Sequence, residues 1–166
     1  MTTTDTALRI TRSRGPLIGA LVTLLGLAGA AWFWVVHPQD LPVDGRERTA
    51  RTPTGAPVYL GIARTDRTIH ITGVRLQVEA SAPVEVRLLR CVGGDVQVTT
   101  DPSAFCTDLE DPSGHALAPA DSLIVEVTGE AAGAAYIRPP QISFTDGLQR
   151  GTRRAGSPAV VTIVGR

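Results

Sequence analysis

"PVEVRLLRC", residues 83–91, alternates apolar Val84, Val86 and Leu88 with charged residues and ends in a cysteine. Because successive side chains of a strand point to opposite faces, this alternation predicts a strand with one buried and one solvated face. A half-buried strand is typical of an antiparallel sheet that packs on one core. The stretch therefore indicates an all-β domain, and Cys91 at its end indicates where that domain is cross-linked.

Cys91 has one other cysteine in the sequence to pair with, Cys106. An even pair in an exported domain usually forms a disulfide, which for a loop of this size stabilises a fold by about 3 kcal/mol. A metal site of both thiols and His115, with Asp108 or Asp111 nearby, is the alternative. Its spacing lacks the C-x-x-C pair and the paired histidines of zinc sites, so we expect the disulfide and no metal.

Strand signals recur on both sides of this stretch, and no segment after residue 36 has a helical period. Seven candidate strands in about 110 residues, joined by short connections, fit a small immunoglobulin-like antiparallel β-sandwich. It is not a true immunoglobulin domain, because both tryptophans precede the domain and the cysteines are too close for an inter-sheet bridge. The other six candidate strands are residues 58–63, 68–80, 93–100, 122–129, 134–146 and 159–165.

Three irregularities interrupt this pattern of strands. The apolar side chains of residues 68–80 change parity at Thr72-Gly73, where a β-bulge of one extra residue restores a single buried face. Pro139-Pro140 cannot continue a central strand, so its segment becomes an edge, a kink or two short pieces. Gly93-Gly94 predicts a hairpin turn after the first strand, and residues 101–121 form a long loop that the disulfide tethers.

Residues 16–36, "PLIGALVTLLGLAGAAWFWVV", carry no charge. As a helix they extend about 31 Å, close to the roughly 30 Å hydrocarbon core of a bilayer. A secretion signal has a shorter apolar run and a small-residue cleavage site, which Ala28-Gly29-Ala30 resembles. The run continues through Trp32 and Trp34, whose rings favour the membrane interface. We therefore expect an uncleaved signal-anchor, with cleavage after Ala30 as the alternative.

Flanking charge predicts the orientation of this span. Arg9, Arg12 and Arg14 precede it, whereas Asp40 and Asp44 follow it before any arginine occurs. Because positive charge stays on the cytoplasmic side, the amino terminus is inside and the rest of the chain is outside. The predicted organisation is a cytoplasmic tail at 1–15, a transmembrane helix at 16–36, a polar, proline-bearing linker at 37–57 and an extracytoplasmic β-sandwich domain at 58–166.

The exported part is nearly neutral. From Asp40 onward it carries 13 arginines against nine aspartates and six glutamates, a net charge of −2. Such a surface has no general attraction for nucleic acid. The chain contains neither lysine nor asparagine, which indicates GC-rich coding DNA and excludes N-glycosylation.

Residues 72–98, "TGVRLQVEASAPVEVRLLRCVGGDVQV", and 142–165, "ISFTDGLQRGTRRAGSPAVVTIVG", carry a resemblance to known proteins. The chain is similar to a group of uncharacterised single-pass, membrane-anchored β-domain proteins of high-GC Gram-positive bacteria. In that group a short basic tail and one span precede a small β domain with a Gly-x-x-x-x-Gly segment before its last strand, here Gly151 to Gly156. The resemblance covers residues 8 to 166 as a pattern and implies fold and location, not chemistry.

Catalytic and metal-binding patterns are weak in this sequence. Asp111-Pro112-Ser113-Gly114-His115 holds the residue types of an acyl-transfer triad, but it lacks a G-x-S-x-G elbow and is typical of a surface turn. The acidic residues of the long loop lack the spacing of a calcium loop, so we expect solvated carboxylates and no metal or cofactor. They are Asp101, Asp108, Glu110 and Asp111.

Two residue sets favour binding. Arg150, Arg153 and Arg154, with Arg138 as a further candidate member, form the charge cluster outside the span. Arginine forks suit the phosphate or carboxylate of a wall polymer or lipid headgroup. The alternative is a hairpin tip that charge keeps soluble. Small residues also recur along one stripe of the span and allow close approach of a second copy or of another membrane protein. They are Gly19, Thr23, Gly26 and Ala30.

The sequence thus predicts a cell-membrane protein whose external domain is a binding or accessory module of the envelope, and not an enzyme. Its expected partners are the lipid bilayer and another membrane protein or a cell-wall component. An enzyme with a dispersed site and a purely structural spacer are the alternatives. A concave pocket with converging titratable groups would favour the enzyme.

Overall fold

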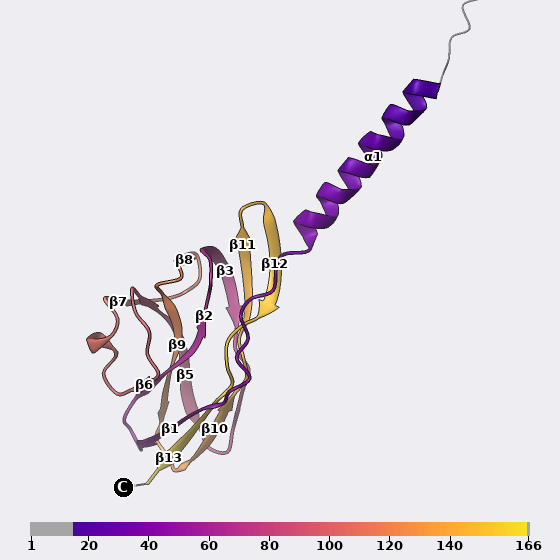
Figure 1. Cartoon of the computed structure of the whole chain (residues 1–166). Coiled ribbons are helices and arrows are strands. Elements are labelled where there is room, and N and C mark those ends of the chain that lie inside the picture. The colour runs from indigo at the N-terminus through magenta and orange to yellow at the C-terminus, as the bar shows by residue number, and fades with distance from the viewer. Residues whose placement is uncertain (1–14, 166) are drawn as a thin grey trace, which may run out of the picture.

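A computed structural model describes residues 15–165 of the 166-residue chain. One N-terminal helix, α1 (Gly15–Val36), leads into a mostly β domain, and the carboxyl terminus lies at the end of that domain away from the helix (Figure 1). The predicted tail, including Arg9, Arg12 and Arg14, lies outside the described residues apart from Gly15.

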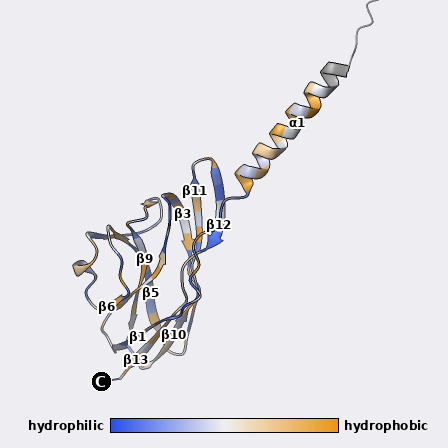
Figure 2. Ribbon diagram, viewed as in Figure 1, coloured by the Kyte–Doolittle hydropathy of each residue, from blue (hydrophilic) through white to orange (hydrophobic). Residues whose placement is uncertain are grey.

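From Gly19 onward helix α1 is mostly apolar and carries no charged residue (Figure 2), and it packs on nothing over most of that stretch. Its stretch Gly19–Val36 is long and apolar enough to cross a membrane, and none of that stretch is buried. A secretion signal near the amino terminus has the same properties. The helix is therefore either a membrane anchor or a signal.

The domain is built of three open sheets in the described part of the chain, with thirteen strands in place of the seven expected. The sheet orders are β1-β13-β10-β4, β12-β11-β3-β8 and β6-β2-β9-β5-β7, and the β1–β13 pair is parallel while the other pairs are antiparallel. The strands are β1 (Arg48–Pro53), β2 (Val58–Arg64), β3 (Ile69–Arg75), β4 (Val78–Ala80), β5 (Val84–Val92), β6 (Val98–Thr99), β7 (Asp108–Glu110), β8 (Ala116–Leu117), β9 (Ser122–Gly129), β10 (Gly133–Ile137), β11 (Gln141–Asp146), β12 (Gln149–Arg154) and β13 (Ala159–Val164).

All three sheets contribute to one apolar core. Alternate residues of the long strands point into it, as the period of two predicts. In β5 the predicted inward residues Val84, Val86 and Leu88 are half-buried and pack against that core. The fully buried members include Leu60, Ile71, Leu123, Val125, Ile137, Ile142, Phe144, Val161 and Ile163.

A second, smaller cluster surrounds the disulfide. Cys91 and Cys106 are bonded, which confirms the predicted pair, and they join β5 to the segment before β7. Val96 and Ile124 complete the buried cluster. Ile124 of β9, the middle strand of its sheet, is covered by this cluster, while its neighbours Leu123 and Val125 face the main core. Burial on both faces suits the apolar run of residues 123–125 in this strand, while Glu126 and Thr128 stay half-buried.

Two predicted irregularities are confirmed. Ile71 pairs with Phe144 and Gly73 with Ser143, so Thr72 is the extra residue of a bulge. Pro139-Pro140 separates β10 from β11, and the two short pieces belong to different sheets.

The predicted hairpin at Gly93-Gly94 is wrong. Strand β6 pairs with β2 and not with β5. Gly94 instead allows a close approach of two backbone segments, because a Cβ at this position would lie 1.9 Å from the Phe105 carbonyl oxygen. The expected loop at 101–121 holds a 3-10 turn, Pro102–Ala104, and the short strands β7 and β8. Strands of two or three residues have no readable period, which is why they escaped the sequence analysis.

The predicted linker at 37–57 is also wrong in part, because residues 37–53, here called the strap, fold onto the domain. Leu41 is 4% exposed, and β1 pairs with β13 along its whole length. The Gly156 N–H donates to the Pro42 carbonyl at 2.8 Å, and the Asp44 N–H donates to the Gly156 carbonyl at 3.1 Å. The strand was missed because its buried side chains are only alanine and threonine.

Gly156, which receives the strap on one side, lies against the backbone of β2 on the other. Its φ is 75°, and a Cβ there would lie 1.8 Å from the Ile62 carbonyl oxygen. We predict that Gly156→Ala lowers the free energy of unfolding by at least about 2 kcal/mol, because it adds backbone strain to a clash with main chain. Gly45→Ala, where no atom lies within 4 Å, is the matched control. Equal denaturant midpoints for the two variants would contradict the described backbone of Gly156 and its contact with β2.

The disulfide gives a second stability prediction. Its cysteines are 15 residues apart, and the paired variant Cys91→Ala/Cys106→Ala should lose about 3 kcal/mol of unfolding free energy, because the unfolded chain regains loop entropy. Urea titration of both proteins with and without a reductant measures the loss. Reductant should shift the midpoint of the parent protein only, and an unchanged parent midpoint would count against a stabilising bond.

Candidate ligand-binding face

The outer face of the β3–β11–β12 sheet is polar throughout. Ile142 and Phe144 of β11 point into the core, so Gln141, Ser143 and Thr145 point outward. Strand registers place further polar residues on both sides of these three. We call this surface the arginine face; it comprises His70, Thr72 and Arg75 of β3, Gln141, Ser143 and Thr145 of β11, and Arg150, Thr152 and Arg154 of β12.

The bulge in β3 is what brings Arg75 to this face. Ile71 is buried, so without an extra residue the alternation would bury Arg75 and expose Val74. The bulge at Thr72 restores Val74 to the core side and leaves Arg75 exposed opposite Gln141. The one extra residue, Thr72, therefore lets Val74 pack on the core and Arg75 lie on the polar face.

Strand β12 supplies the other edge of the face and is strongly hydrophilic (Figure 2). It follows β11 through the two-residue turn Gly147-Leu148, and the φ of 57° at Gly147 suits a tight hairpin turn. Its burial alternates, with Gln149 5% exposed and Arg150 in solvent. The strand was not predicted, because its inward residues are polar or glycine.

A hollow of about 230 Å³ opens at one end of the arginine face. Arg75 and Arg154 both pair with Gln141, one on each side. The Arg138 Nε donates to Glu79 Oε1 at 3.0 Å, whereas no ion pair is formed by Arg75 or Arg154 within residues 15–165. We call this hollow the arginine pocket; its lining is Arg75, Gln77, Tyr136, Arg138, Pro139, Gln141 and Arg154.

The predicted anion-binding set is therefore divided by the structure. Arg150 and Arg154 lie on the arginine face, but Arg153 points to the opposite face of β12. Its Nε donates to Asp40 Oδ1 at 2.9 Å and its Nη2 to the Pro38 carbonyl at 3.3 Å. Arg153 is thus a structural contact to the strap. Arg75, which sequence reasoning missed, lies on the arginine face, because strand pairing brings it beside Gln141.

A second hollow, of about 220 Å³, lies between the strap and β2. Its charged residues neutralise one another: Arg64 lies 3.2 Å from Asp95, and Arg48 lies 3.8 Å from Asp44. This hollow therefore offers less charge to a ligand than the arginine pocket does.

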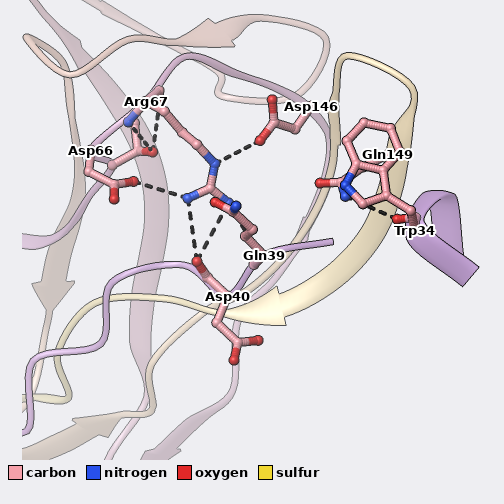
Figure 3. Close-up of polar contacts among 8 residues, drawn as sticks. Trp34, Gln39, Asp40, Asp66, Arg67, Asp146 and Gln149 are labelled. Atoms are coloured by element: carbon pink, nitrogen blue, oxygen red, sulfur yellow. Dashed lines mark hydrogen bonds and ion pairs between the residues drawn. The ribbon is translucent and has the colours of Figure 1, made fainter. Parts of the chain in front are cut away.

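The helix meets the domain in a cluster of polar contacts, here called the junction (Figure 3). Gln149 Nε2 donates to the Trp34 carbonyl at 3.0 Å. Arg67 Nε donates to Asp146 Oδ2 at 2.7 Å, and its Nη2 donates to the Gln39 carbonyl at 3.1 Å. Together with Arg153, these side chains hold the start of the strap against β12. No sequence signal identifies the junction, because its members are far apart in the chain.

The predicted membrane residues lie on the exposed helix. Trp32 and Trp34 are 72% and 56% exposed. In the small-residue stripe, Thr23 Oγ1 donates to the Gly19 carbonyl at 3.0 Å within the helix. Space for a Cβ is open at Gly19 and Gly26, so the stripe is uncovered. Its packing on a second helix, and the interface role of the tryptophans, stay predictions.

Most of the suspected triad and calcium residues have local structural roles, and Glu110 instead lies 3.3 Å from Arg90 of the neighbouring strand β5. Asp101 Oδ1 accepts from the Ser103 N–H at 3.1 Å, and Asp111 Oδ1 accepts from the Ser113 N–H at 2.8 Å. His115 Nδ1 lies 2.9 Å from the Asp111 carbonyl oxygen. Such short-range bonds are typical of turns. In the part of the chain that the structure describes, no three histidine, cysteine or acidic side chains group as metal ligands.

Tyr59 belongs to a further polar cluster, on the five-stranded sheet. Its hydroxyl donates to Glu126 Oε1 at 3.0 Å, and Arg87 Nη1 lies 3.6 Å from Glu126 Oε2. Burial raises the pKa of the phenol above its ordinary value of 10.0, and Glu126 raises it further. A phenol that keeps its proton is a hydrogen-bond donor and not a nucleophile, so this cluster supports structure.

Comparison with known proteins finds no matching family model and no significantly similar curated protein. The resemblance to membrane-anchored β-domain proteins therefore remains a prediction from the sequence.

The Tyr59 cluster yields a prediction for alkaline solution. Because the pKa of Tyr59 is higher in the folded state, its contribution to stability is full below about pH 10 and is lost as pH rises through the folded pKa. Tyr59→Phe removes the titrating group, so unfolding free energy should fall less steeply above about pH 10 than in the parent protein. Urea midpoints across that range measure the difference. Parallel curves would show that the hydrogen bond to Glu126 does not persist in solution.

Proposed function

We propose that this protein is a single-pass, membrane-anchored binding or accessory module of the bacterial cell envelope. Its β domain would lie outside the cytoplasmic membrane and engage another membrane protein or a cell-wall component. The apolar helix α1 and the Cys91–Cys106 disulfide support this location, because disulfides persist in oxidising compartments. An immunoglobulin-like outline for the domain belongs to the same proposal, supported by the single core to which all three sheets contribute.

The junction is the observation that carries the proposal. Gln149 and Arg67 bond the carbonyls of Trp34 and Gln39, so the domain follows the helix with no free linker between them (Figure 3). A helix seated in a bilayer would then hold the domain directly at the membrane surface. This arrangement suits a module that acts close to the membrane.

The aromatic end of α1 favours an anchor over a cleaved signal. Cleavage after Ala30 would leave Trp32, Phe33 and Trp34 at the new amino terminus, and they are 72%, 62% and 56% exposed. Exposed apolar clusters of this kind are rare on soluble proteins. In a retained anchor the same rings lie in the headgroup region, where indole is stabilised.

The turn of the β11–β12 hairpin supports a surface close to the bilayer. Leu148 in that turn is 74% exposed. Its neighbour Gln149 bonds the Trp34 carbonyl, which places the turn beside the last turns of α1 (Figure 1). An exposed leucine at this level would contact lipid headgroups, whereas in solution it would be unfavourably hydrated.

Membrane fractionation of the full chain tests the proposal. We predict that it stays with membranes through a high-salt wash, that its intact mass includes residues 16–36, and that protease added to spheroplasts digests the β domain. The physical reason is that a retained helix of this length cannot leave the bilayer without exposing its apolar surface. A product in the medium that begins near Ala31, or a domain that protease reaches only after lysis, would contradict the proposal. A cytoplasmic enzyme of the same cells serves as the lysis control.

A further inference from the structure

We propose that the arginine pocket binds one phosphate or carboxylate group of an anionic cell-envelope polymer. The inference deepens the proposed function, since it rests on an extracytoplasmic domain and names the chemistry of its ligand. The polymer would continue from the pocket along the arginine face.

Strand pairing builds a cradle for one anion. Gln141 lies between Arg75 and Arg154 in the register of the sheet. Neighbouring strands are about 4.8 Å apart, so the two arginine Cα atoms flank Gln141 at roughly 10 Å. Arginine side chains are long enough to converge above the amide from both sides. Two guanidinium forks and an amide N–H are donors suited to phosphate or carboxylate oxygens.

The charge balance of the pocket also favours an anion. Arg138 is paired with Glu79, an interaction exposed to solvent on both sides. Arg75 and Arg154 form no ion pair with any residue from 15 to 165. The nine residues that make up the arginine face include no aspartate or glutamate. Two like charges on either side of Gln141 repel one another, and a bound anion relieves that repulsion.

The size and continuation of the face indicate a polymer rather than a compact ligand. The pocket of about 230 Å³ is smaller than the roughly 300–1,000 Å³ of sites that enclose a whole small molecule. It has room for one charged group beside the ring of Tyr136. A wider, open hollow on the same face is lined in part by His70, Arg150 and Thr152. Arg150 lies about 13 Å from Arg154 along β12, and this spacing suits a polymer ligand with repeated charges.

The position of the pocket favours a wall polymer over lipid headgroups. Strand β12 runs away from α1 (Figure 1), and the Gln141–Arg154 pair is at the end opposite the Gly147-Leu148 turn. Five residues of strand separate them, or about 17 Å. Headgroups level with the turn therefore lie too far from the pocket to fill it.

Titration calorimetry on the full chain in nanodiscs of zwitterionic lipid tests the inference. The probes are inorganic phosphate, polyphosphate and polygalacturonate, which separate a single anion from a phosphate or a carboxylate polymer. We expect at least one polymer to bind more tightly than inorganic phosphate. Arg75→Gln and Arg154→Gln should each weaken that binding at least tenfold, because each removes a charge-assisted contact. Arg46→Gln, which removes an exposed arginine of the strap, should weaken it less than twofold.

Three outcomes would overturn the inference: no saturable binding of either polymer, an equal loss in Arg46→Gln, or loss of polymer binding when the nanodiscs contain phosphatidylglycerol. The last result would assign the pocket to lipid. Unchanged thermal midpoints and an intact Cys91–Cys106 bond in each variant show that folding is not the cause. Membrane fractionation is independent of these titrations, so an anchored protein without polymer binding would retain the proposed function and lose only this ligand.

Discussion

Docking of the strap on the carboxyl-terminal part of the chain is the constraint on which the rest of the structure depends. Gly156 receives it through two backbone hydrogen bonds, and β1 then continues as the parallel partner of β13. Parallel pairing needs strands that are far apart in sequence, and here they are the first and last strands of the domain. The beginning and end of the domain are thereby held together, and helix α1 joins the domain where the strap begins.

This constraint sets where the functional surfaces lie. Because Arg153 and Arg67 bond the strap, the β11–β12 hairpin is fixed beside the end of the helix. The same hairpin carries Leu148 at its turn and Arg154 at its far end. One strand pair therefore presents an apolar residue toward the proposed membrane and a positively charged pocket away from it. Gln149, which lies between these two surfaces in the chain, is buried and donates a hydrogen bond to the Trp34 carbonyl. Both surfaces are therefore held to the end of the helix.

Much of the domain could be predicted from the sequence, because long strands with apolar alternation reveal their buried face. Even the bulge at Thr72 follows from a change of parity. The strap and β12 were missed for one physical reason: their inward positions hold Thr52, Gln149 and Gly151, which are satisfied by pairing and hydrogen bonds rather than by apolar burial. The arginine pocket could not be predicted, because Arg75 and Arg154 come together only through their common neighbour Gln141 in β11. Local periodicity predicts strands but not their order in a sheet.

Hydrogen–deuterium exchange of the full chain in nanodiscs, followed by mass spectrometry, tests the docked strap most directly. The amides of Asp44, Arg48 and Gly156 are hydrogen-bonded where the strap docks, and alternate amides of the edge strand β1 point toward β13. Peptides covering residues 42–53 should therefore retain a fraction of amides that exchange about as slowly as those of β13. Complete exchange of that segment within seconds, while β13 remains protected, would show a free linker and would contradict the account.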